Sequence, residues 1–436
     1  MSTIPVNNKR IINGWAMYDW ANSVYALVIA TAIFPPYYNY VTSSNGHKVS
    51  IFGHWLDNSA IYFFSISLSF LIVAFLSPIL SALADSIGNK KPFMQFFCWL
   101  GSLSCMSMFF FDKSNISLGI ALIILAGIGF SGSIVFYNAY LPEIASEDQQ
   151  DKVSAKGFGM GYFGSSLLLV FCLLLILHPT WFGLQKNLFG YDSFPVRFSF
   201  LLTGLWWLGF AQITFRRLPS TPINYEHVHA GVIKSGYAAL HDVLKQLRNT
   251  PILKRFLIAF FFYSMGVQTV MYVASTFGSK EIKLAQDQLI LTMLIIQYIG
   301  VGGAFLFAWL SKKIGNFKSL TLAVVLWIFI CFGAYFVYSA IPFLILGGCV
   351  GLVMGGIQSL SRSTYSKLLP ETENHASFFS FFDVSEKLAI TLGTFSFGFI
   401  DEWTGSMRNS IVVLIAYFVV GIIILGNILW KVHKSK

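Results

Sequence analysis

Long hydrophobic runs, separated by short polar segments, follow one another along nearly the whole chain. Each run is about 20 residues long, the length that a helix needs to cross a hydrocarbon core of about 30 Å. Because lipid offers no hydrogen-bond partners to the backbone, such runs are expected to form helices. We predict membrane-spanning helices at residues 13–35, 59–83, 92–111, 115–139, 157–177, 197–215, 253–276, 287–310, 319–339, 341–366, 376–400 and 409–430. The pattern therefore predicts an all-α polytopic membrane protein with twelve transmembrane helices.

The composition agrees with this pattern. Of the 436 residues, 56% are hydrophobic and only 11% are charged, whereas a soluble domain carries roughly 25% charged residues. The five cysteines lie inside hydrophobic runs without paired spacing, which argues against disulfides and thiolate metal sites. His227 and His229, in the central polar segment, do not belong to a set of ligands with metal-binding spacing. We expect neither a metal nor a cofactor.

The basic residues are unevenly divided between the two sides of this predicted topology. Most of the 29 Lys and Arg residues fall in segments on the same side as the N-terminus. By the positive-inside rule that side is the cytoplasm, so both termini are expected there. The net charge of +10 thus reflects membrane topology. We expect a lipid bilayer around the chain, no nucleic-acid partner, and a monomer.

Two short motifs each occur twice at nearly the same separation, which indicates an internal duplication. Ile-Gly-Asn occurs at residues 87–89 and again at 314–316, and Leu-Pro-Glu occurs at 141–143 and again at 369–371. Each of the four copies follows a predicted helix that ends on the same side of the membrane as the N-terminus. Since many transporters are built from repeats, we predict two six-helix repeats.

The predicted parts are an N-terminal six-helix half at 1–215, a cytoplasmic linker at 216–252 and a C-terminal six-helix half at 253–436. Within the linker, apolar residues at helical spacing alternate with basic ones, which predicts an amphipathic surface helix. The apolar positions are Val232, Ile233, Leu240, Val243, Leu244 and Leu247. A plain connector and a regulatory site are both compatible with such a helix.

The loop after the second predicted helix, SALADSIGNKKPFM at 81–94, resembles the signature loop of the major facilitator superfamily. An acid at a helix end, followed by basic residues, can hold neighbouring helices together by charge, and glycine permits a tight reversal. The matching positions, which we expect to act as a gating loop, are Asp85, Gly88, Lys90 and Lys91. In the second copy Lys312 stands at the aspartate position, so gating is expected mainly in the first half. The alternative is a plain basic turn.

Three further stretches carry a more specific resemblance. They are GWAMYDWANSVYALVIATAIFPPYY at 14–38, GGIQSLSRSTYSKLLPE at 355–371 and FFSFFDVSEKLAITLG at 378–393. Together they resemble the vacuole-effluxer-like branch of the major facilitator superfamily, most specifically through Tyr-Asp-Trp-Ala-Asn. Eukaryotic members are similar to yeast autophagy-linked vacuolar exporters of amino acids, while most bacterial members have no assigned substrate. Met265 departs from the pattern, since the seventh helix often has an acid before its glycine.

The resemblance implies the major facilitator fold, in which the first, fourth, seventh and tenth helices line a central cavity that opens alternately to each side. It also implies a bacterial inner (plasma) membrane as the location. Asp19 fits this arrangement, because a charge in a membrane helix costs at least about 2.5–3.5 kcal/mol unless it faces protein, water or a partner. Tyr18, Asn22 and Tyr25 lie near it on the same stripe of the first helix. We expect all four residues to line the cavity.

Arg362, on the tenth predicted helix, is a candidate partner for Asp19. In the repeat it corresponds to Ile134, so an apolar position has become cationic. We hypothesise that Asp19 and Arg362 approach each other when the inner side closes, as part of a substrate site and part of a gate. The alternative is that each charge is neutralised within its own half, Arg362 for instance by an acid of the eleventh helix. Protonation of Asp19 is the leading candidate for ion coupling.

Three other polar residues are candidates for the cavity wall. Gln268 on the seventh helix and Gln358 on the tenth supply neutral hydrogen-bonding groups. Lys387 on the eleventh helix lies four residues after Asp383, a spacing at which the two charges can neutralise each other. A structural ion pair and a role for Lys387 in coupling or substrate binding both remain open.

The sequence predicts a secondary active transporter rather than an enzyme, since no cluster of His, Asp and Glu typical of membrane-embedded catalysis is visible. Without an ATP-binding loop, its energy must come from a solute gradient or a coupled ion. We expect efflux of a small polar solute by alternating access, with amino acids as the first candidate and the proton as the candidate coupling ion. The alternatives are an exporter of drugs, sugars or other metabolites, and a non-transporting membrane sensor.

Overall fold

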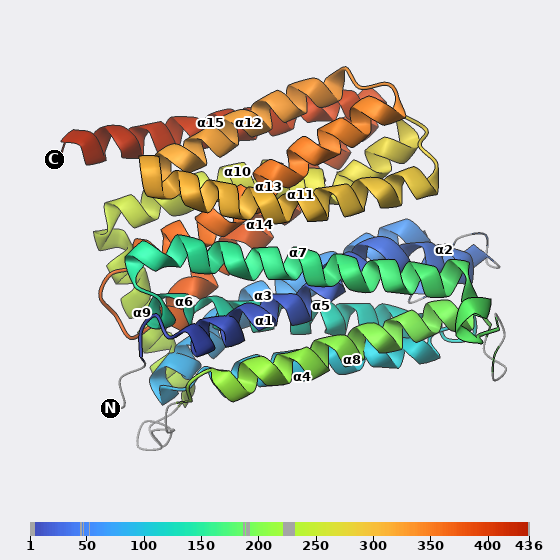
Figure 1. The fold of residues 1–436 in the computed structure, drawn as a ribbon, viewed down its shortest axis with the longest axis horizontal. Coiled ribbons are helices and arrows are strands. Elements are labelled where there is room, and N and C mark those ends of the chain that lie inside the picture. Colours follow the sequence, from blue (N-terminus) through green and yellow to red (C-terminus); the bar gives the residue numbers. More distant parts are fainter. Residues whose placement is uncertain are drawn as a thin grey trace.

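The helices lie in two groups, one formed by the first half of the chain and the other by the second (Figure 1). The computed structural model describes residues 5–43, 46, 48–51, 53–185, 188, 192–220 and 232–434. Both chain termini lie at one end of the bundle (Figure 1). We call this end the terminal side and the opposite end the far side.

The first group of helices, called the N-terminal half, begins with α1 at Lys9. They are α1 (Lys9–Val24), η1 (Tyr25–Ile33), α2 (Phe34–Thr42), α3 (Asn58–Ile87), α4 (Lys91–Ser107), η3 (Met108–Phe110), α5 (Ile116–Asn138), α6 (Leu141–Ile144), α7 (Glu147–Leu177), η4 (Pro179–Phe182) and α8 (Phe194–Arg217). A two-stranded antiparallel hairpin, β1 (Lys48–Ile51) with β2 (His54–Asp57), joins α2 to α3 and pairs Val49 with Leu56. This hairpin was not predicted, because four-residue strands in a loop leave no long hydrophobic run, and the remaining described elements are helical.

The second group, called the C-terminal half, follows the connecting helix α9 (Val232–Asn249). It contains α10 (Pro251–Lys280), α11 (Gln286–Ile314), α12 (Asn316–Tyr335), α13 (Ala340–Lys367), α14 (His375–Thr404) and α15 (Met407–Lys434). Prolines in the first turns of α4, α8 and α10 help to start these helices, since a backbone N–H at that position has no helical acceptor.

Ten helices in the described ranges are long and apolar enough to cross a membrane. The predicted spans at 13–35 and 376–400 are not among them. The first corresponds to α1, η1 and α2, which follow one another without a break from Lys9 to Thr42 but include the π-helical η1. The second corresponds to α14, which carries charged side chains at Asp383, Glu386 and Lys387. The count of twelve membrane helices stays a prediction.

The π-helical segment η1 interrupts the first predicted span next to the cavity described below. The Tyr62 hydroxyl donates to the carbonyl oxygen of Ala30 at 2.5 Å, and Thr31 Oγ1 donates to that of Ala26 at 2.7 Å. Side chains of this kind compensate backbone groups that lose regular helical bonding inside a membrane. Glycines let α13 approach α11 closely, since a methyl group on Gly351 or Gly355 would overlap a carbonyl oxygen of α11.

The linker helix α9 packs against α3 of the N-terminal half and against α10 and α14 of the C-terminal half. The prediction of a helix in this segment is therefore confirmed. Val243 is buried and Leu244 is exposed, whereas the side chains of Val232, Ile233 and Leu240 lie outside the described part of the structure. His227 and His229 also lie outside it.

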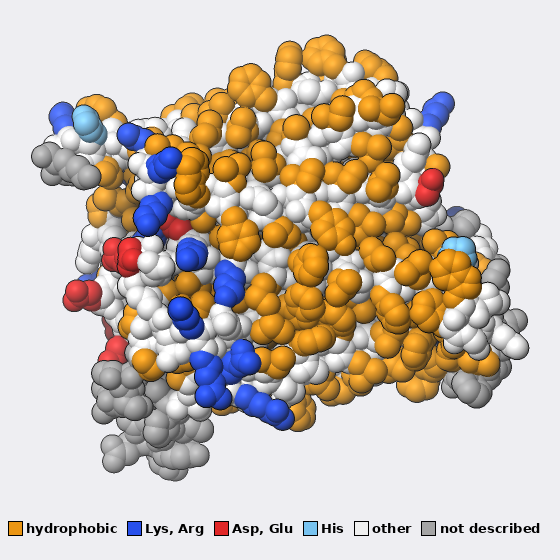
Figure 2. Space-filling model, viewed as in Figure 1, with side chains coloured by type: hydrophobic (Ala, Val, Ile, Leu, Met, Phe, Trp, Pro, Cys, Tyr) orange, Lys and Arg blue, Asp and Glu red, His pale blue; other side chains and the backbone are white. Residues whose placement is uncertain are grey.

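The surface differs between the middle of the bundle and its terminal side. Figure 2 shows that hydrophobic side chains dominate the middle of the visible face, while Lys and Arg side chains gather at the terminal side. Large apolar side chains such as Phe75, Phe329 and Phe395 are strongly exposed. A belt of this kind matches the hydrocarbon region of a bilayer, where exposed apolar groups are stable.

Candidate functional site

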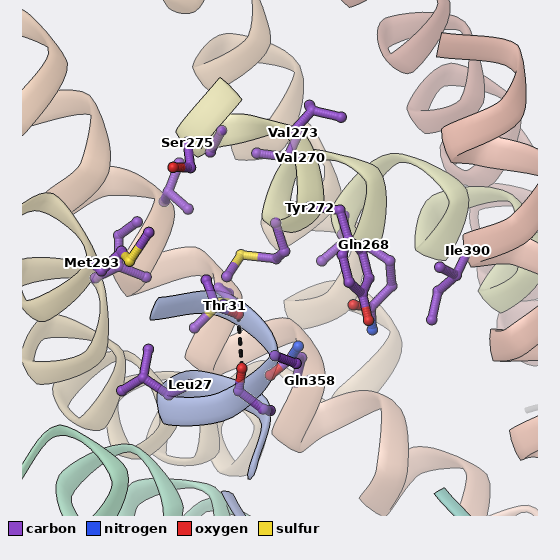
Figure 3. A pocket seen from close by; sticks show the side chains of 18 of the residues that line it. Leu27, Thr31, Gln268, Val270, Tyr272, Val273, Ser275, Met293, Gln358 and Ile390 are labelled. Carbon is purple, nitrogen blue, oxygen red and sulfur yellow. Dashed lines mark hydrogen bonds between the residues drawn. The ribbon is translucent and has the colours of Figure 1, made fainter. Parts of the chain in front are cut away.

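A cavity of about 820 Å³ lies between the N-terminal and C-terminal halves. Its walls come from α1, η1, α2, α3, α5 and α7 of one half and from α10, α11, α12, α13, α14 and α15 of the other. Figure 3 shows part of it, with Leu27 and Thr31 of η1, Gln268 and Tyr272 of α10, and Gln358 of α13. The site is therefore built from both halves of a single chain.

The cavity runs along the bundle toward the far side. Asp19 and Arg362 line it at one end, and Asn58 and Lys280, at the far-side ends of α3 and α10, line it at the other. Beyond Asp19, toward the terminal side, helix ends of the two halves contact each other. The molecule is thus closed at the terminal side.

Asp19 of α1 and Arg362 of α13 form an ion pair that joins the two halves. Oδ2 of Asp19 lies 3.3 Å from both Nη1 and Nη2 of Arg362, and it accepts a 2.8 Å hydrogen bond from the Tyr137 hydroxyl. Both charged side chains are buried. The structure therefore brings together the two residues that the sequence proposes as partners.

The guanidinium of Arg362 has further partners on α5 and α7. Nε donates to Ser154 Oγ and Nη2 to the Ser154 carbonyl oxygen, both at 2.9 Å, and Nη1 donates to Asn138 Oδ1 at 3.2 Å. The rings of Trp15 and Phe158 lie 4.7 Å and 4.2 Å from the guanidinium carbon. Planar contacts of this kind suit a buried arginine, which keeps its charge. Neither Ser154 nor Asn138 was predicted.

Gly157 lets the backbone of α7 pass close to this ion pair. A methyl group at this position would overlap both Asp19 Oδ2 and Arg362 Nη2. Only glycine leaves enough room for the carboxylate and the guanidinium to meet beside α7.

A second charged group lies in the wall formed by α14. Nζ of Lys387 lies 3.2 Å from Asp383 Oδ1 and 3.7 Å from Glu386 Oε2, so the predicted contact between Lys387 and Asp383 is present. Gln268 Nε2 of α10 donates to Glu386 Oε1 at 2.7 Å. Lys387, Glu386 and Gln268 line the cavity, and Nζ of Lys387 also lies 5.2 Å from the centre of the Phe70 ring.

Three other predicted residues also line the cavity, namely Asn22, Tyr25 and Gln358. The Gln358 amide oxygen accepts a 2.5 Å hydrogen bond from the Tyr162 hydroxyl of α7. The sequence analysis did not predict a role for Tyr162. The Tyr25 hydroxyl lies 3.5 Å from the carbonyl oxygen of Ile123 in α5.

Tyr18 does not lie on the cavity wall, so this part of the predicted stripe is wrong. Its side chain is fully buried within the N-terminal half, with its ring 5.3 Å from the ring of Tyr137 and 6.0 Å from that of Phe215. Successive residues of a helix point about 100° apart. A rotation of this size separates Tyr18, which faces α5 and α8, from Asp19, which faces the other half.

The predicted gating loop links the two halves through Asp85. Its carboxylate, at the end of α3, accepts hydrogen bonds from the backbone N–H groups of Ala376 at 3.2 Å and Ser377 at 2.7 Å, and from the Ser377 hydroxyl at 2.6 Å. These groups belong to the first turn of α14, where the helix dipole favours a negative charge. Gly88 ends α3 with a φ of 74°, a left-handed conformation that favours glycine.

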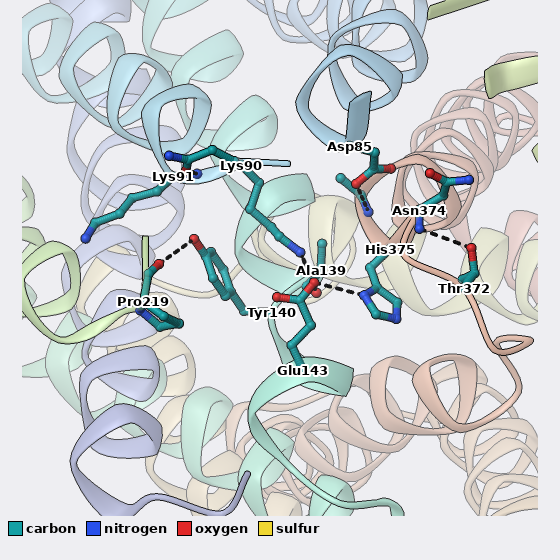
Figure 4. Close-up of polar contacts among 12 residues, drawn as sticks. Asp85, Lys90, Lys91, Ala139, Tyr140, Glu143, Pro219, Thr372, Asn374 and His375 are labelled. Atoms are coloured by element: carbon teal, nitrogen blue, oxygen red, sulfur yellow. Dashed lines mark hydrogen bonds and ion pairs between the residues drawn. The ribbon is translucent and has the colours of Figure 1, made fainter. Parts of the chain in front are cut away.

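The basic residues of the same loop contact other segments on the terminal side (Figure 4). Lys90 pairs with Glu143, whose Oε1 also lies 2.9 Å from Nδ1 of His375 in α14. Nζ of Lys91 donates to the carbonyl oxygen of Leu218, just after α8, at 3.0 Å. Lys90 and Lys91 thus fix the loop within the N-terminal half, while Glu143 reaches the other half.

A further cross-half contact, absent from the sequence predictions, is centred on Asp151 of α7. Its Oδ2 lies 2.7 Å from Nζ of Lys367 and accepts from Ser311 Oγ at 2.7 Å, while its Oδ1 accepts from Asn316 Nδ2 at 2.8 Å. In the second copy of the loop, Lys312 stands where the first copy has Asp85. The acid that contacts this second copy is Asp151, which belongs to α7. The sequence analysis did not predict these contacts, which we call the Asp151 latch, and the expectation that gating lies mainly in the first half stays a prediction.

The far side differs from the terminal side in its charged contacts. Within the described ranges, the ion pairs that join the two halves all lie on the terminal side or at the cavity end facing it. Near the far side, Arg197 pairs with Asp112 at 2.9 Å inside the N-terminal half. Partial burial opposes ionisation of Asp112, but hydrogen bonds from Ser114 and the charge of Arg197 hold its pKa below the usual value.

Comparisons with known proteins identify the family of the chain. The family described as "Vacuole effluxer Atg22 like" matches residues 7–436. An MFS-type transporter of Bacillus subtilis, YxiO, described as uncharacterized, is 30% identical over 95% of this chain and 94% of its own length. Autophagy-related protein 22 of Coccidioides immitis is 23% identical over 92% of this chain and 83% of its own length.

Solved structures of transporters share the fold. The chain resembles the transporter FucP in the outward conformation, with a TM-score of 0.69 and 13% identity over 96% of this chain and 97% of that chain. It also resembles a bacterial homologue of the iron transporter ferroportin in an outward-facing state, with a TM-score of 0.63 and 14% identity over 96% and 98% of the two chains. The chain therefore belongs to the Atg22-like vacuole effluxer family of major facilitator superfamily transporters.

Proposed function

We propose that this protein is a secondary active transporter that exports a small polar solute by alternating access, with amino acids as the first candidate substrate. The observation that carries the proposal is the cavity of about 820 Å³ between the halves, closed at one end by the Asp19–Arg362 ion pair. The description of the family as vacuole effluxers supports efflux. The cavity is complete within one chain, which supports a monomer.

The distribution of charge supports an orientation in the membrane. Lys and Arg gather at the terminal side of the visible face (Figure 2), and such residues favour the cytoplasmic side. We therefore assign the terminal side, with both termini, to the cytoplasm. Similarity to a Bacillus subtilis transporter supports the plasma membrane of a bacterium. In this orientation the cavity faces outward, as in the two outward-facing structures that the chain resembles.

Alternating access requires the terminal-side contacts to separate. The contacts that must break include the Asp19–Arg362, Asp151–Lys367 and Glu143–His375 pairs and the hydrogen bonds from α14 to Asp85. Since a charge left buried without its partner is strongly unfavourable, the separated groups need water or solute in their place. Opening toward the cytoplasm supplies both.

The proton is our candidate coupling ion, with Asp19 as its site. While the pair is closed, Asp19 Oδ2 is held by Arg362 and Tyr137. The cavity gives protons from the far side access to this carboxylate, and a bound proton can leave to the cytoplasm when the halves separate at the terminal side. A protonated Asp19 no longer attracts Arg362 strongly, which links the proton to the position of the gate.

A transport screen in proteoliposomes tests this proposal. Purified protein would be assayed for uptake from a labelled pool that contains amino acids, sugars and organic anions, with Asp19→Asn as the defective variant and Glu402→Gln as the matched control. Glu402 is an exposed acid of α14 outside the cavity lining. We expect amino-acid transport by the parent protein and the control, and little by Asp19→Asn. Selective transport of sugars or organic anions, or none of any solute, contradicts the amino-acid assignment.

Proton coupling has a separate test in the same vesicles. Imposing a pH gradient is expected to drive solute accumulation, and a protonophore is expected to remove it. Transport that ignores both the gradient and the protonophore would eliminate the role proposed for protonation of Asp19.

A further inference from the structure

The charge balance of the cavity lining depends on Asp383, a buried residue outside the lining that contacts Lys387. The charged residues of the lining are Asp19, Lys280, Arg362, Glu386 and Lys387. Asp19 and Arg362 neutralise each other at 3.3 Å, and Lys280 is exposed in the last turn of α10 at the far-side mouth. The remaining charges belong to the cluster on α14, and they decide the electrostatic character of the middle of the cavity.

The α14 cluster contains two acids and one base. Lys387 Nζ lies between Asp383 Oδ1 at 3.2 Å and Glu386 Oε2 at 3.7 Å. One ammonium group cannot neutralise two carboxylates, so with all three ionised the cluster keeps one negative charge. The Asp383 side chain is only 2% exposed, whereas that of Glu386 is 24% exposed. The unbalanced charge therefore faces the cavity at Glu386.

We propose that Glu386 binds the ammonium group of the transported solute, an inference that rests on the proposed function and makes the substrate class more specific. Gln268 Nε2 donates to Glu386 Oε1 at 2.7 Å and holds the carboxylate in the cavity wall. Cations are attracted to an unbalanced carboxylate most strongly where the surrounding walls exclude water. The solute is thus an amine or a zwitterion with its cationic end toward α14.

A second observation in the same cavity also points to a ligand. Asn22 lines the cavity and is 1% exposed, yet its Nδ2 atom has no hydrogen-bond acceptor among the described atoms. A buried amide donor without an acceptor is unfavourable. Because this atom has almost no accessible surface, the Asn22 side chain must turn toward the cavity before a solute carbonyl or carboxylate oxygen can accept from it. An acceptor site at Asn22 and a cation site at Glu386 together match a small zwitterion.

Binding measurements with matched probes test this assignment on the purified full-length protein. The probes are L-leucine, 3-methylbutylammonium and 4-methylpentanoate, which share an apolar chain and differ in carrying both charges, only the ammonium, or only the carboxylate. We expect binding of the first two, measured by calorimetry, and none of the third. Binding of 4-methylpentanoate as tight as that of L-leucine would overturn the proposal.

Substitutions in the cluster test the charge count itself. Glu386→Gln and Asp383→Asn should each weaken binding of the ammonium probe by about 10- to 100-fold, because each removes the unbalanced charge. The double variant Asp383→Asn/Lys387→Met removes one charge of each sign and should bind within about threefold of the parent. The control, Glu402→Gln, should bind as the parent does. Thermal unfolding of each variant shows whether it is folded.

Other outcomes would overturn the inference. If Asp383→Asn binds the ammonium probe as tightly as the parent, Asp383 carries no charge and the count is wrong. If Glu386→Gln keeps its affinity but loses the pH dependence of transport, Glu386 binds a proton and not the solute. If the parent transports amino acids while Glu386→Gln changes neither affinity nor transport, this inference fails and the proposed function stands.

Discussion

Two charged clusters line the same cavity, yet they are built in opposite ways. The Asp19–Arg362 pair has one acid and one base from different halves, and its members have additional partners in Tyr137, Ser154 and Asn138. The α14 cluster has two acids and one base on a single helix. A balanced pair between the halves forms only when the two halves are in contact, so its formation depends on the conformation of the protein. An unbalanced cluster within one helix moves as a unit and is suited to holding a cation in every state.

The largest expected effect comes from removing one partner of the balanced pair. Arg362→Gln leaves Asp19 buried without its cation, so we expect a loss of about 3–5 kcal/mol in the free energy of unfolding. We also expect transport to fall below detection. Denaturation of the purified protein and transport in vesicles measure the two effects. Lys312→Gln, which removes an exposed base on the same side, should leave both unchanged; equal losses in the two variants would remove the special role of Arg362.

A double variant separates two effects of the single substitutions, the loss of the ion pair and the burial of one charge without its partner. Asp19→Asn/Arg362→Gln leaves no unpaired charge, so it should be more stable than the sum of the single variants by about 1–3 kcal/mol. Transport should stay defective, because the gate has lost its attraction. Additive losses of stability in a double-mutant cycle would show that the two side chains do not interact.

A smaller effect is expected at the Asp151 latch. Asp151→Asn weakens the contacts to Lys367, Ser311 and Asn316, and we expect the equilibrium to shift by about 1–3 kcal/mol toward opening at the terminal side. Hydrogen exchange should become faster in residues 141–151 and 364–377, while the far side keeps its protection. Faster exchange at both ends would indicate general destabilisation, and unchanged exchange would show that Asp151 does not hold the halves together.

The smallest expected effect is at a neutral contact of the cavity wall. Tyr162→Phe removes the hydroxyl that donates to Gln358 at 2.5 Å, a loss of about 0.5–1.5 kcal/mol for a neutral hydrogen bond. We expect KM for the solute to rise about two- to tenfold with little change in maximal rate. A loss as large as that of Arg362→Gln would contradict the distinction between the charged gate and the neutral wall.

The sequence predicted the charged residues of the site better than the neutral ones. A charge inside an apolar run is costly and has few possible partners, so Asp19 and Arg362 could be proposed as a pair from different halves. Ser154, Asn138 and Tyr162 carry no such cost, and their roles depend on distances between helices that no local pattern encodes. The Tyr18 prediction failed because a stripe of helical positions does not say which of its edges faces the partner half.

The fold, like the site, was predicted in some parts and not in others. Hydrophobic runs predicted the helices because that signal is local, whereas the two-repeat organisation, inferred from motifs far apart in the chain, stays a prediction. The latch at Asp151 could not be predicted, since its acid lies on α7 and its partners on α11, α12 and α13. The hairpin β1–β2 was missed because strands of four residues leave too weak a pattern.

A reversible crosslink at the terminal side tests the central claim, that transport requires the two halves to separate there. Cysteines replacing Asp151 and Lys367, whose charged atoms lie 2.7 Å apart, would be joined by a reducible bifunctional methanethiosulfonate. The background would be Cys349→Ser, since Cys349 is exposed while the other four cysteines are buried. We predict that transport in vesicles stops while the crosslink is intact and returns after reduction. Transport that continues through the crosslinked protein would contradict this account.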